Sequence, residues 1–192
     1  NIMAIVLASQ SPRRQELLAR IGVEDFKTLS LDIDESYPAT LSPEDTVRFI
    51  AGKKSEAAAA LCAPDDLIIT ADTMVFLGSE RLGKPQDEED AFRMLRALSG
   101  ERHTVCTGVS LRQGGRYESF AVSTAVYFRP MTDEEIRAYI KTGEPMDKAG
   151  SYGVQSRGAL FVERIDGDFF NVMGLPVEQL GLALARFGVK LL

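Results

Sequence analysis

The run from Leu67 to Phe76 constrains the fold most, because it is apolar on both of its alternating faces. Such a run predicts a strand that is covered on both sides, as in the parallel sheets of α/β proteins. Asp72 interrupts this run. A carboxylate in a buried strand is costly unless it is paired, hydrogen-bonded or facing a metal ion, so Asp72 marks a candidate site. The structural alternative is an aspartate that accepts hydrogen bonds from backbone N–H groups at a turn.

The chain opens with a strand that leads directly into a helix. The strand is predicted over residues 5–8, and Ser11 and Pro12 are suited to the cap and the first position of the helix. Arg13 and Arg14 then fall in the first turn, where the helix dipole disfavours cations. Two guanidinium groups beside free backbone N–H groups suit a phosphate, although arginines that simply extend into water would give the same pattern.

A second capped helix is predicted to begin at Ser42 and Pro43 and to run to about Ala63. Its apolar residues recur at helical spacing, and Lys54 falls on that apolar stripe whereas Lys53 does not. A lysine on an inward face either snorkels past its neighbours or points its ammonium group into a cleft that holds an anion. Of the two lysines, Lys54 is therefore the candidate for binding an anion.

Two loops carry charges whose meaning the residues alone leave open. Three carboxylates lie within residues 32–35, and such a cluster either binds a divalent cation or is a solvated loop. The segment 78–85 matches a P-loop as far as G-x4-G-K, but Pro85 stands where a Ser or Thr would bind magnesium. A hairpin turn that delivers Lys84 on its returning segment is the simpler interpretation.

The remaining segments complete an alternation of strands and helices. The loop 147–155, polar and glycine-bearing, has the composition of loops that contact ligands, although a plain connector would look similar. The other predicted elements are a strand over 26–31, a helix over 87–98, a hairpin of 103–111 and 117–128, a helix from the capping box at Thr132 to about Thr142, a strand over 159–165 and a helix over 176–187.

Composition limits the function classes. The formal charge of −6, from 28 acidic and 22 basic residues, disfavours non-specific binding to nucleic acid or to an anionic membrane. Cys62 and Cys106 are far apart and form no metal or disulfide framework, so we expect reduced thiols in the cytoplasm. No apolar run approaches the roughly 18 residues of a membrane helix. We expect residues 1–192 to form one domain.

Taken together, the segments resemble the Maf family of nucleoside triphosphate pyrophosphatases. The resemblance covers nearly the whole chain and rests on segments in the family's order: residues 9–18, Asp34-Glu35, 71–73, 83–85, 146–155 and 174–176. It implies an α/β fold with a mixed, strongly twisted sheet, flanking helices and two lobes around a central cleft. It also implies a homodimer.

The resemblance further implies hydrolysis between the α and β phosphates of a nucleoside triphosphate, giving the monophosphate and pyrophosphate, with Mg²⁺, Mn²⁺ or Co²⁺. Asp72 is then the general base or a metal ligand, and Glu35 a metal ligand. Arg14, Lys54 and Lys84 are the phosphate clamp, with Lys54 and Lys84 among the catalytic residues. The expected substrate-binding residues are Ser9, Ser11, Arg13, Arg14, Thr73, Lys148, Tyr152 and Gln155.

Within the family, the branch that matches Arg13, Thr73 and Gln155 is associated with dTTP, UTP and modified uridine triphosphates. The amide of Gln155 suits a pyrimidine edge, since it can donate to a carbonyl and accept from a ring N–H. We therefore expect uracil and thymine nucleotides as substrates. The alternatives are a regulator of cell division and septum formation that acts by binding, and a pyrophosphatase for modified purine triphosphates such as 7-methyl-GTP.

Overall fold

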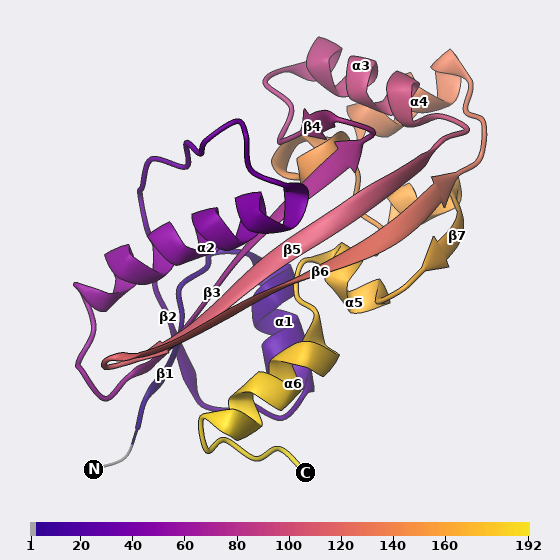
Figure 1. Ribbon diagram of the computed structural model, residues 1–192. Helices are drawn as coiled ribbons and strands as arrows, with labels where there is room; N and C mark the ends of the chain where they lie inside the picture. Colours follow the sequence, from indigo (N-terminus) through magenta and orange to yellow (C-terminus); the bar gives the residue numbers. More distant parts are fainter. Residues whose placement is uncertain (1–2) are drawn as a thin grey trace. The chain divides into compact units, whose positions relative to one another are not determined.

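The protein has a mixed α/β fold, seen in a computed structural model that describes residues 3–192 (Figure 1). Within these residues, a seven-stranded sheet has the order β2-β1-β3-β5-β6-β7, and β4 pairs with β3. The strand β1 (Ile5–Leu7) lies between β2 (Phe26–Thr28) and β3 (Leu67–Leu77), and it is parallel to both. The fold class predicted from the sequence is confirmed, including the strand at residues 67–76.

The chain divides into two compact units, in keeping with the predicted lobes. The first unit contains the chain up to Asp72 together with residues 107–122 and 174–192, and the second contains residues 73–106 and 123–173. The strands β3, β5 (Arg102–Gln113) and β6 (Arg116–Phe128) each contribute residues to both units. The chain thus passes from the first unit into the second directly after Asp72.

The first unit holds three of the helices, and α2 packs closely on the strands β3 and β5. These helices are α1 (Pro12–Arg20), α2 (Pro43–Ala59) and α6 (Val177–Arg186) (Figure 1). The hydroxyl of Thr70 donates to the carbonyl of Ala51 at 2.7 Å and also contacts the Ser110 hydroxyl, so β3 is bonded both to the helix and to β5.

Gly108 in β5 allows this close packing. A Cβ atom at this position would lie 2.4 Å from the carbonyl carbon of Val47 and 2.6 Å from the backbone nitrogen of Arg48. Real Cβ atoms do not approach a backbone so closely, and the interior is too densely packed for the helix to move away freely. The absence of a side chain at residue 108 therefore sets the distance between α2 and the sheet.

Two boundaries in this unit differ from the sequence prediction. The helix expected to reach residue 63 ends at Ala59, with Ala60 as its C-cap, and the strand expected over 26–31 is limited to 26–28. The residues after Ala59 are alanine, leucine and cysteine, which carry no stop signal. The helix ends instead in a turn in which Leu61 donates its N–H to Ala58.

The second unit combines short helices with the far ends of the long strands. Arg157–Phe161 is a 3-10 helix, so the strand expected over 159–165 begins later, at Val162. The five-residue helix α5 was not predicted. The elements of this unit are β4 (Glu80–Leu82), α3 (Glu88–Leu98), α4 (Asp133–Lys141), β7 (Val162–Asp166), α5 (Phe169–Met173) and three 3-10 helices at Glu144–Asp147, Ala149–Ser151 and Arg157–Phe161.

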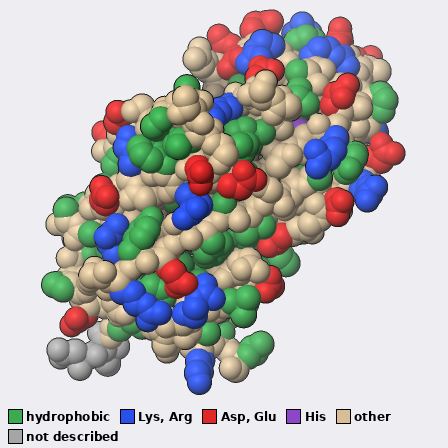
Figure 2. All heavy atoms as spheres, viewed as in Figure 1, with side chains coloured by type: hydrophobic (Ala, Val, Ile, Leu, Met, Phe, Trp, Pro, Cys, Tyr) green, Lys and Arg blue, Asp and Glu red, His purple; other side chains and the backbone are tan. Residues whose placement is uncertain are grey.

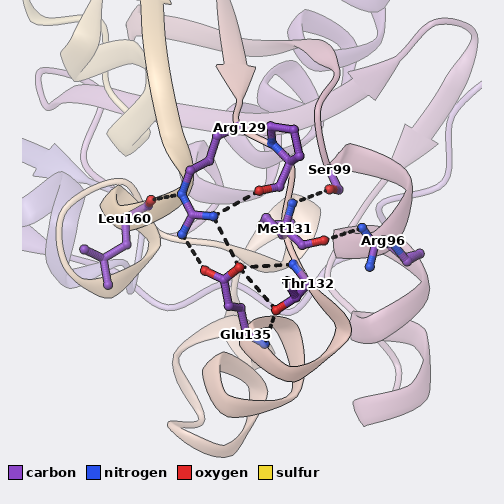
Figure 3. A network of polar contacts seen from close by, with 8 residues as sticks. Arg96, Ser99, Arg129, Met131, Thr132, Glu135 and Leu160 are labelled. Atoms are coloured by element: carbon purple, nitrogen blue, oxygen red, sulfur yellow. Dashed lines mark hydrogen bonds and ion pairs between the residues drawn. The ribbon is translucent and has the colours of Figure 1, made fainter.

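The start of α4 is fixed by the predicted capping box, shown in Figure 3. The Thr132 hydroxyl accepts from the backbone N–H of Glu135 at 3.1 Å, and the Glu135 carboxylate accepts from the N–H of Thr132 at 3.1 Å. Arg129 donates to the same carboxylate at 2.6 Å. The hydrogen bonds from Arg129 and then Thr132 hold the pKa of Glu135 at about 2.

A histidine lies in the core of this unit. His103 is 1% exposed, and its Nε2 is 2.6 Å from the hydroxyl of Tyr152. The ring of Phe128 packs edge-on against His103 and against Tyr152, with centroids 4.9 and 4.7 Å apart. Burial, with a smaller contribution from Arg102, lowers the pKa of His103 to about 4, so the imidazole is neutral at pH 7.

Among the helices of residues 3–192, none has the length and apolar character that crossing a bilayer requires. On the face drawn in Figure 2, lysine and arginine side chains alternate with aspartate and glutamate side chains.

Candidate active site

Asp72 forms a buried ion pair with Lys54 in the first unit. The carboxylate is in a residue that is 8% exposed, and its Oδ1 is 3.2 Å from Lys54 Nζ. The ammonium also donates to the carbonyl of Ala71 at 3.0 Å and lies 3.5 Å from Oε1 of Glu35. The other oxygen, Asp72 Oδ2, is buried and has no hydrogen-bond partner within the described residues. Asp72 therefore has one carboxylate oxygen available for a further ligand.

The helix α2 delivers Lys54 to this acid. Ser42 caps its start by accepting from the backbone N–H of Asp45 at 3.1 Å, and the face of the helix that meets the sheet is buried. Lys54 lies on this face, whereas its neighbour Lys53 donates to the carbonyl of Ser36 at 3.0 Å. The structure thus brings Lys54, and not Lys53, to Asp72.

The charges around Asp72 oppose the effect of burial. Burial raises the pKa of the carboxyl above its usual value, and Glu35 adds to this, while Lys54 and Arg14 lower it. Burial likewise lowers the pKa of Arg14, against the attraction of Asp72 and Glu35. These four side chains, two acids and two bases, therefore form one electrostatic group.

The first turn of α1 contributes a second set of polar groups. Ser11 caps the helix, and the Ser9 hydroxyl accepts from the Ser11 N–H at 3.2 Å and from Arg14 Nη1 at 3.4 Å. Arg14 Nε donates to the carbonyl of Gly174 at 2.8 Å, which orients the guanidinium. Arg13 makes no hydrogen bond or ion pair within residues 3–192, and the first turn contains no acid. This helix end therefore suits an anion.

Five predicted residues lie in the second unit, where their environments differ. Lys84 is exposed just after β4, as the hairpin prediction requires, and Thr73 is half-buried in β3. Lys148 donates to the carbonyl of Glu144 at 2.8 Å, and Gln155 is exposed. Tyr152 is 5% exposed and directs its hydroxyl to the core histidine described above.

The loops that carry Lys84 and Lys148 contact one another. The N–H of Gly150 donates to the carbonyl of Gly83 at 3.1 Å. Gly150 has a φ of 72°, and a Cβ there would lie 2.7 Å from Val75 Cγ2. Only glycine satisfies both the conformation and the space, so these two loops are held together by a position that tolerates no side chain.

Glu35 and Asp72 fit a divalent cation that binds together with phosphate. Mg²⁺ is commonly held by one or two carboxylates and by substrate phosphates, without a complete cage of protein ligands. Asp72 offers a buried oxygen without a partner in the described part of the chain, and Glu35 offers a carboxylate that is 56% exposed. Residues 3–192 contain no group of three His, Cys, Asp or Glu side chains that could hold a metal ion. The pair therefore matches a site that phosphate oxygens complete.

Comparison with known proteins identifies the family of this chain. A family model described as "Maf-like protein" matches residues 4–187. The chain belongs to the Maf family. A protein of Bacillus velezensis named "dTTP/UTP pyrophosphatase" is 47% identical to this Maf chain over 186 residues, which are 97% of each chain. A protein of Phocaeicola vulgatus with the same name is 50% identical over 184 residues, or 95% of each.

Two solved structures share the fold of this Maf chain. The Ham1 protein of Staphylococcus aureus superimposes with a TM-score of 0.53 at 15% identity, over 96% of this chain and 99% of that one. A Ham1 protein of Coxiella burnetii gives the same TM-score at 12% identity, over 96% and 100%. At these identities the likeness extends to the fold alone.

Sequence reasoning missed contacts that come from the backbone or from distant residues. The carbonyls of Ala71 and Gly174 orient Lys54 and Arg14, and a carbonyl has no residue-specific signal. Tyr139 was also missed, although its hydroxyl accepts from the N–H of Gly153 in the predicted loop 147–155. Its position on the inner face of α4 gave no reason to separate it from ordinary core residues.

Proposed function

We propose that this Maf protein hydrolyses dTTP, UTP and modified uridine triphosphates to the nucleoside monophosphate and pyrophosphate. The charged group of Asp72, Lys54, Glu35 and Arg14, in which Asp72 and Lys54 form a buried ion pair, is the observation that carries the proposal. The names of relatives that are 47% and 50% identical over nearly the whole chain support the substrate class. Removal of such triphosphates would serve to clean the nucleotide pool.

In the proposed reaction, water attacks the α-phosphorus and the bond to the bridging oxygen of pyrophosphate breaks. Asp72 either takes the proton of the attacking water or holds a divalent cation, and Lys54 keeps the carboxyl oriented. Lys54, Arg14 and Lys84 offset charge on the departing pyrophosphate. The catalytic residues are therefore Asp72, Glu35, Lys54 and Lys84.

We further propose that Glu35 and Asp72 hold Mg²⁺, or Mn²⁺ or Co²⁺ in its place. When bound, the ion would neutralise part of the charge on the phosphate oxygens. Ser9, Ser11, Arg13 and Arg14 would hold phosphate at the start of α1, where Arg13 has no described partner and no acid offsets its charge.

In the second unit, Gln155 would read the base, and Thr73 and Lys148 would contact the nucleotide. Tyr152 would act through its backbone or through the shape of its loop, because its hydroxyl contacts His103. A cytoplasmic location and a homodimer are also proposed; light scattering on the purified protein tests the dimer.

A panel of triphosphates tests the function. Release of pyrophosphate is measured with dTTP, UTP, CTP, ATP, GTP and 7-methyl-GTP, and dTTP and UTP are expected to give the highest kcat/KM. A preference for 7-methyl-GTP would replace the proposed substrates with modified purine nucleotides. Absence of turnover with every triphosphate in the presence of Mg²⁺ would remove the enzymatic assignment.

The variant Asp72→Asn separates an enzyme from a regulator that acts by binding. It should lower kcat for UTP by about 10²- to 10⁴-fold, the range for loss of a general acid or base, while UTP still binds in calorimetry. Asp65→Asn is the matched control, since Asp65 is an exposed residue of the same unit. A cellular effect on division that survives Asp72→Asn would favour the binding regulator.

A further inference from the structure

Gln155 lies in a short turn whose two ends are held by the same pair of side chains. The Tyr139 hydroxyl accepts from the backbone N–H of Gly153 at 3.0 Å. The Glu144 carboxylate accepts from the backbone N–H of Gly158 through Oε2 at 3.1 Å. Gln155 is exposed between these two fixed glycines.

The two supporting side chains lie on neighbouring elements and act on one another. Tyr139 is in α4, and Glu144 begins the 3-10 helix that follows it. Burial, and then the nearby Glu144 carboxylate, raise the pKa of the Tyr139 phenol. The two ends of the turn are therefore held from adjacent parts of the chain.

The glycines at the ends of the turn leave no room for a looser arrangement. A Cβ at Gly158 would lie 2.1 Å from the carbonyl oxygen of Gly153 and 2.8 Å from the Tyr139 hydroxyl. The preceding Ser151 is fully buried and has a φ of 66°, which residues other than glycine rarely adopt. A conformation of this kind persists only where its surroundings determine it, and such positions cluster at ligand-binding sites.

The same support also reaches Lys148. Its ammonium group donates to the backbone carbonyl of Glu144 at 2.8 Å, and its side chain is 16% exposed. The stem of Lys148 packs where Gly153 lacks a side chain, since a Cβ there would lie 2.7 Å from Lys148 Cε. The carboxylate of Glu144 thus holds the turn, while its carbonyl holds the lysine.

We infer that Tyr139 and Glu144 are positioning residues that fix the turn carrying Gln155 and thereby set the preference of the enzyme for uracil over cytosine. The inference rests on the proposed function, in which Gln155 reads the base. A glutamine amide carries both a donor and an acceptor, and when turned over it can pair with cytosine as well as with uracil. Because rotation about the last side-chain bond exchanges donor and acceptor, selectivity requires a turn that holds the amide where only one orientation meets the base.

The test measures a selectivity ratio, kcat/KM for UTP divided by kcat/KM for CTP. Tyr139→Phe removes one hydroxyl and Glu144→Gln removes one charge. Each variant is expected to lower the ratio about five- to ten-fold, the effect of one lost hydrogen bond, mainly through a higher KM for UTP. A variant that merely unfolds a fraction of the enzyme lowers both activities equally and leaves the ratio unchanged.

Tyr127→Phe is the matched control. Its hydroxyl makes no hydrogen bond within residues 3–192, and its ring, which lies 5.2 Å from the guanidinium of Arg164, is retained in phenylalanine. This variant should keep the wild-type ratio. In a Gln155→Ala background, Tyr139→Phe should cause no further loss of selectivity, because the side chain through which Tyr139 acts on the base has been removed.

An unchanged ratio in both Tyr139→Phe and Glu144→Gln overturns the inference, and so does a further loss in the Gln155→Ala background. Should Glu144→Gln fail to fold, Tyr139→Phe alone decides the matter. A wild-type enzyme that turns over CTP and UTP with equal efficiency also overturns it while leaving triphosphate hydrolysis intact. A wild-type protein without any turnover overturns the proposed function, and the inference with it.

Discussion

Lowering the pH should destabilise the folded protein through one side chain, His103. It is the only histidine in the chain and is 1% exposed, and burial lowers its pKa from 6.5 to about 4. Between these two pH values the unfolded chain binds a proton at the imidazole and the folded chain does not. The free energy of unfolding therefore falls as the pH is lowered through this window.

The size of the effect follows from the two pKa values. One pKa unit corresponds to about 1.4 kcal/mol, so a difference of about 2.5 units gives a loss of about 3 kcal/mol by pH 4. This is a large share of the 5–15 kcal/mol that typically stabilise a folded protein. The imidazolium would also lack a place in the core, since Nδ1 has no hydrogen-bond partner in the described residues.

Urea unfolding of the wild type and of His103→Gln, at several pH values from 7.5 to 4, isolates this contribution. Carboxylates titrate in both proteins and cancel in the difference. The variant should be the less stable at pH 7, because it disturbs packing with Phe128 and Tyr152. By pH 4 the wild type should have lost about 3 kcal/mol more than the variant. Parallel curves for the two proteins over this range would refute the argument from burial.

Three further outcomes are expected. Lys54→Ala should lower kcat/KM for UTP about 100-fold in the pyrophosphate assay, whereas Lys53→Ala, on the same helix, should stay within about two-fold; equal losses would contradict the role of the buried ion pair. Gly108→Ala should destabilise the protein by about 2 kcal/mol or more in urea unfolding, because the added Cβ meets the backbone of Val47. Gly181→Ala in α6 is the control and should stabilise by about 0.5–1 kcal/mol, since its Cβ would have no neighbour within 4 Å; a similar loss in both would show that packing at β5 is not the cause. Removal of divalent cations by EDTA should abolish turnover, and Mg²⁺ should restore it; full activity in excess EDTA would exclude the proposed ion.

The parts of the fold that were predicted well are those with local causes. Ser11, Ser42 and Thr132 each cap the helix they were expected to cap, because a cap needs only its own next three residues. The buried strand around Asp72 was also clear, since a run that is apolar on both faces has few other uses. By contrast, α5 is too short to show a helical period, and the 3-10 helix at 157–161 resembles a strand in composition.

In the candidate site, too, local patterns could be predicted from the sequence and contacts between distant residues could not. The apolar stripe of α2 was sufficient to choose Lys54 over Lys53, and the structure brings Lys54 to Asp72. The bond between Arg14 and the carbonyl of Gly174 joins positions 160 residues apart, and no pattern in the sequence could predict it. The burial of Tyr152 against His103 is a similar case, because a tyrosine in a glycine-rich loop is equally suited to a ligand or to the core.

Gly108 sets how far the side chain of Lys54 has to reach, because it fixes the distance between α2 and the sheet. Val47, whose backbone rests against Gly108, precedes Lys54 by seven residues, or about two helical turns, on the same rigid helix. Any methyl group at position 108 that lifts this helix would carry the ammonium away from the acid by a similar amount. Homologues with a larger residue at this place would need a longer cation, or a bent helix, to keep the same charge contact.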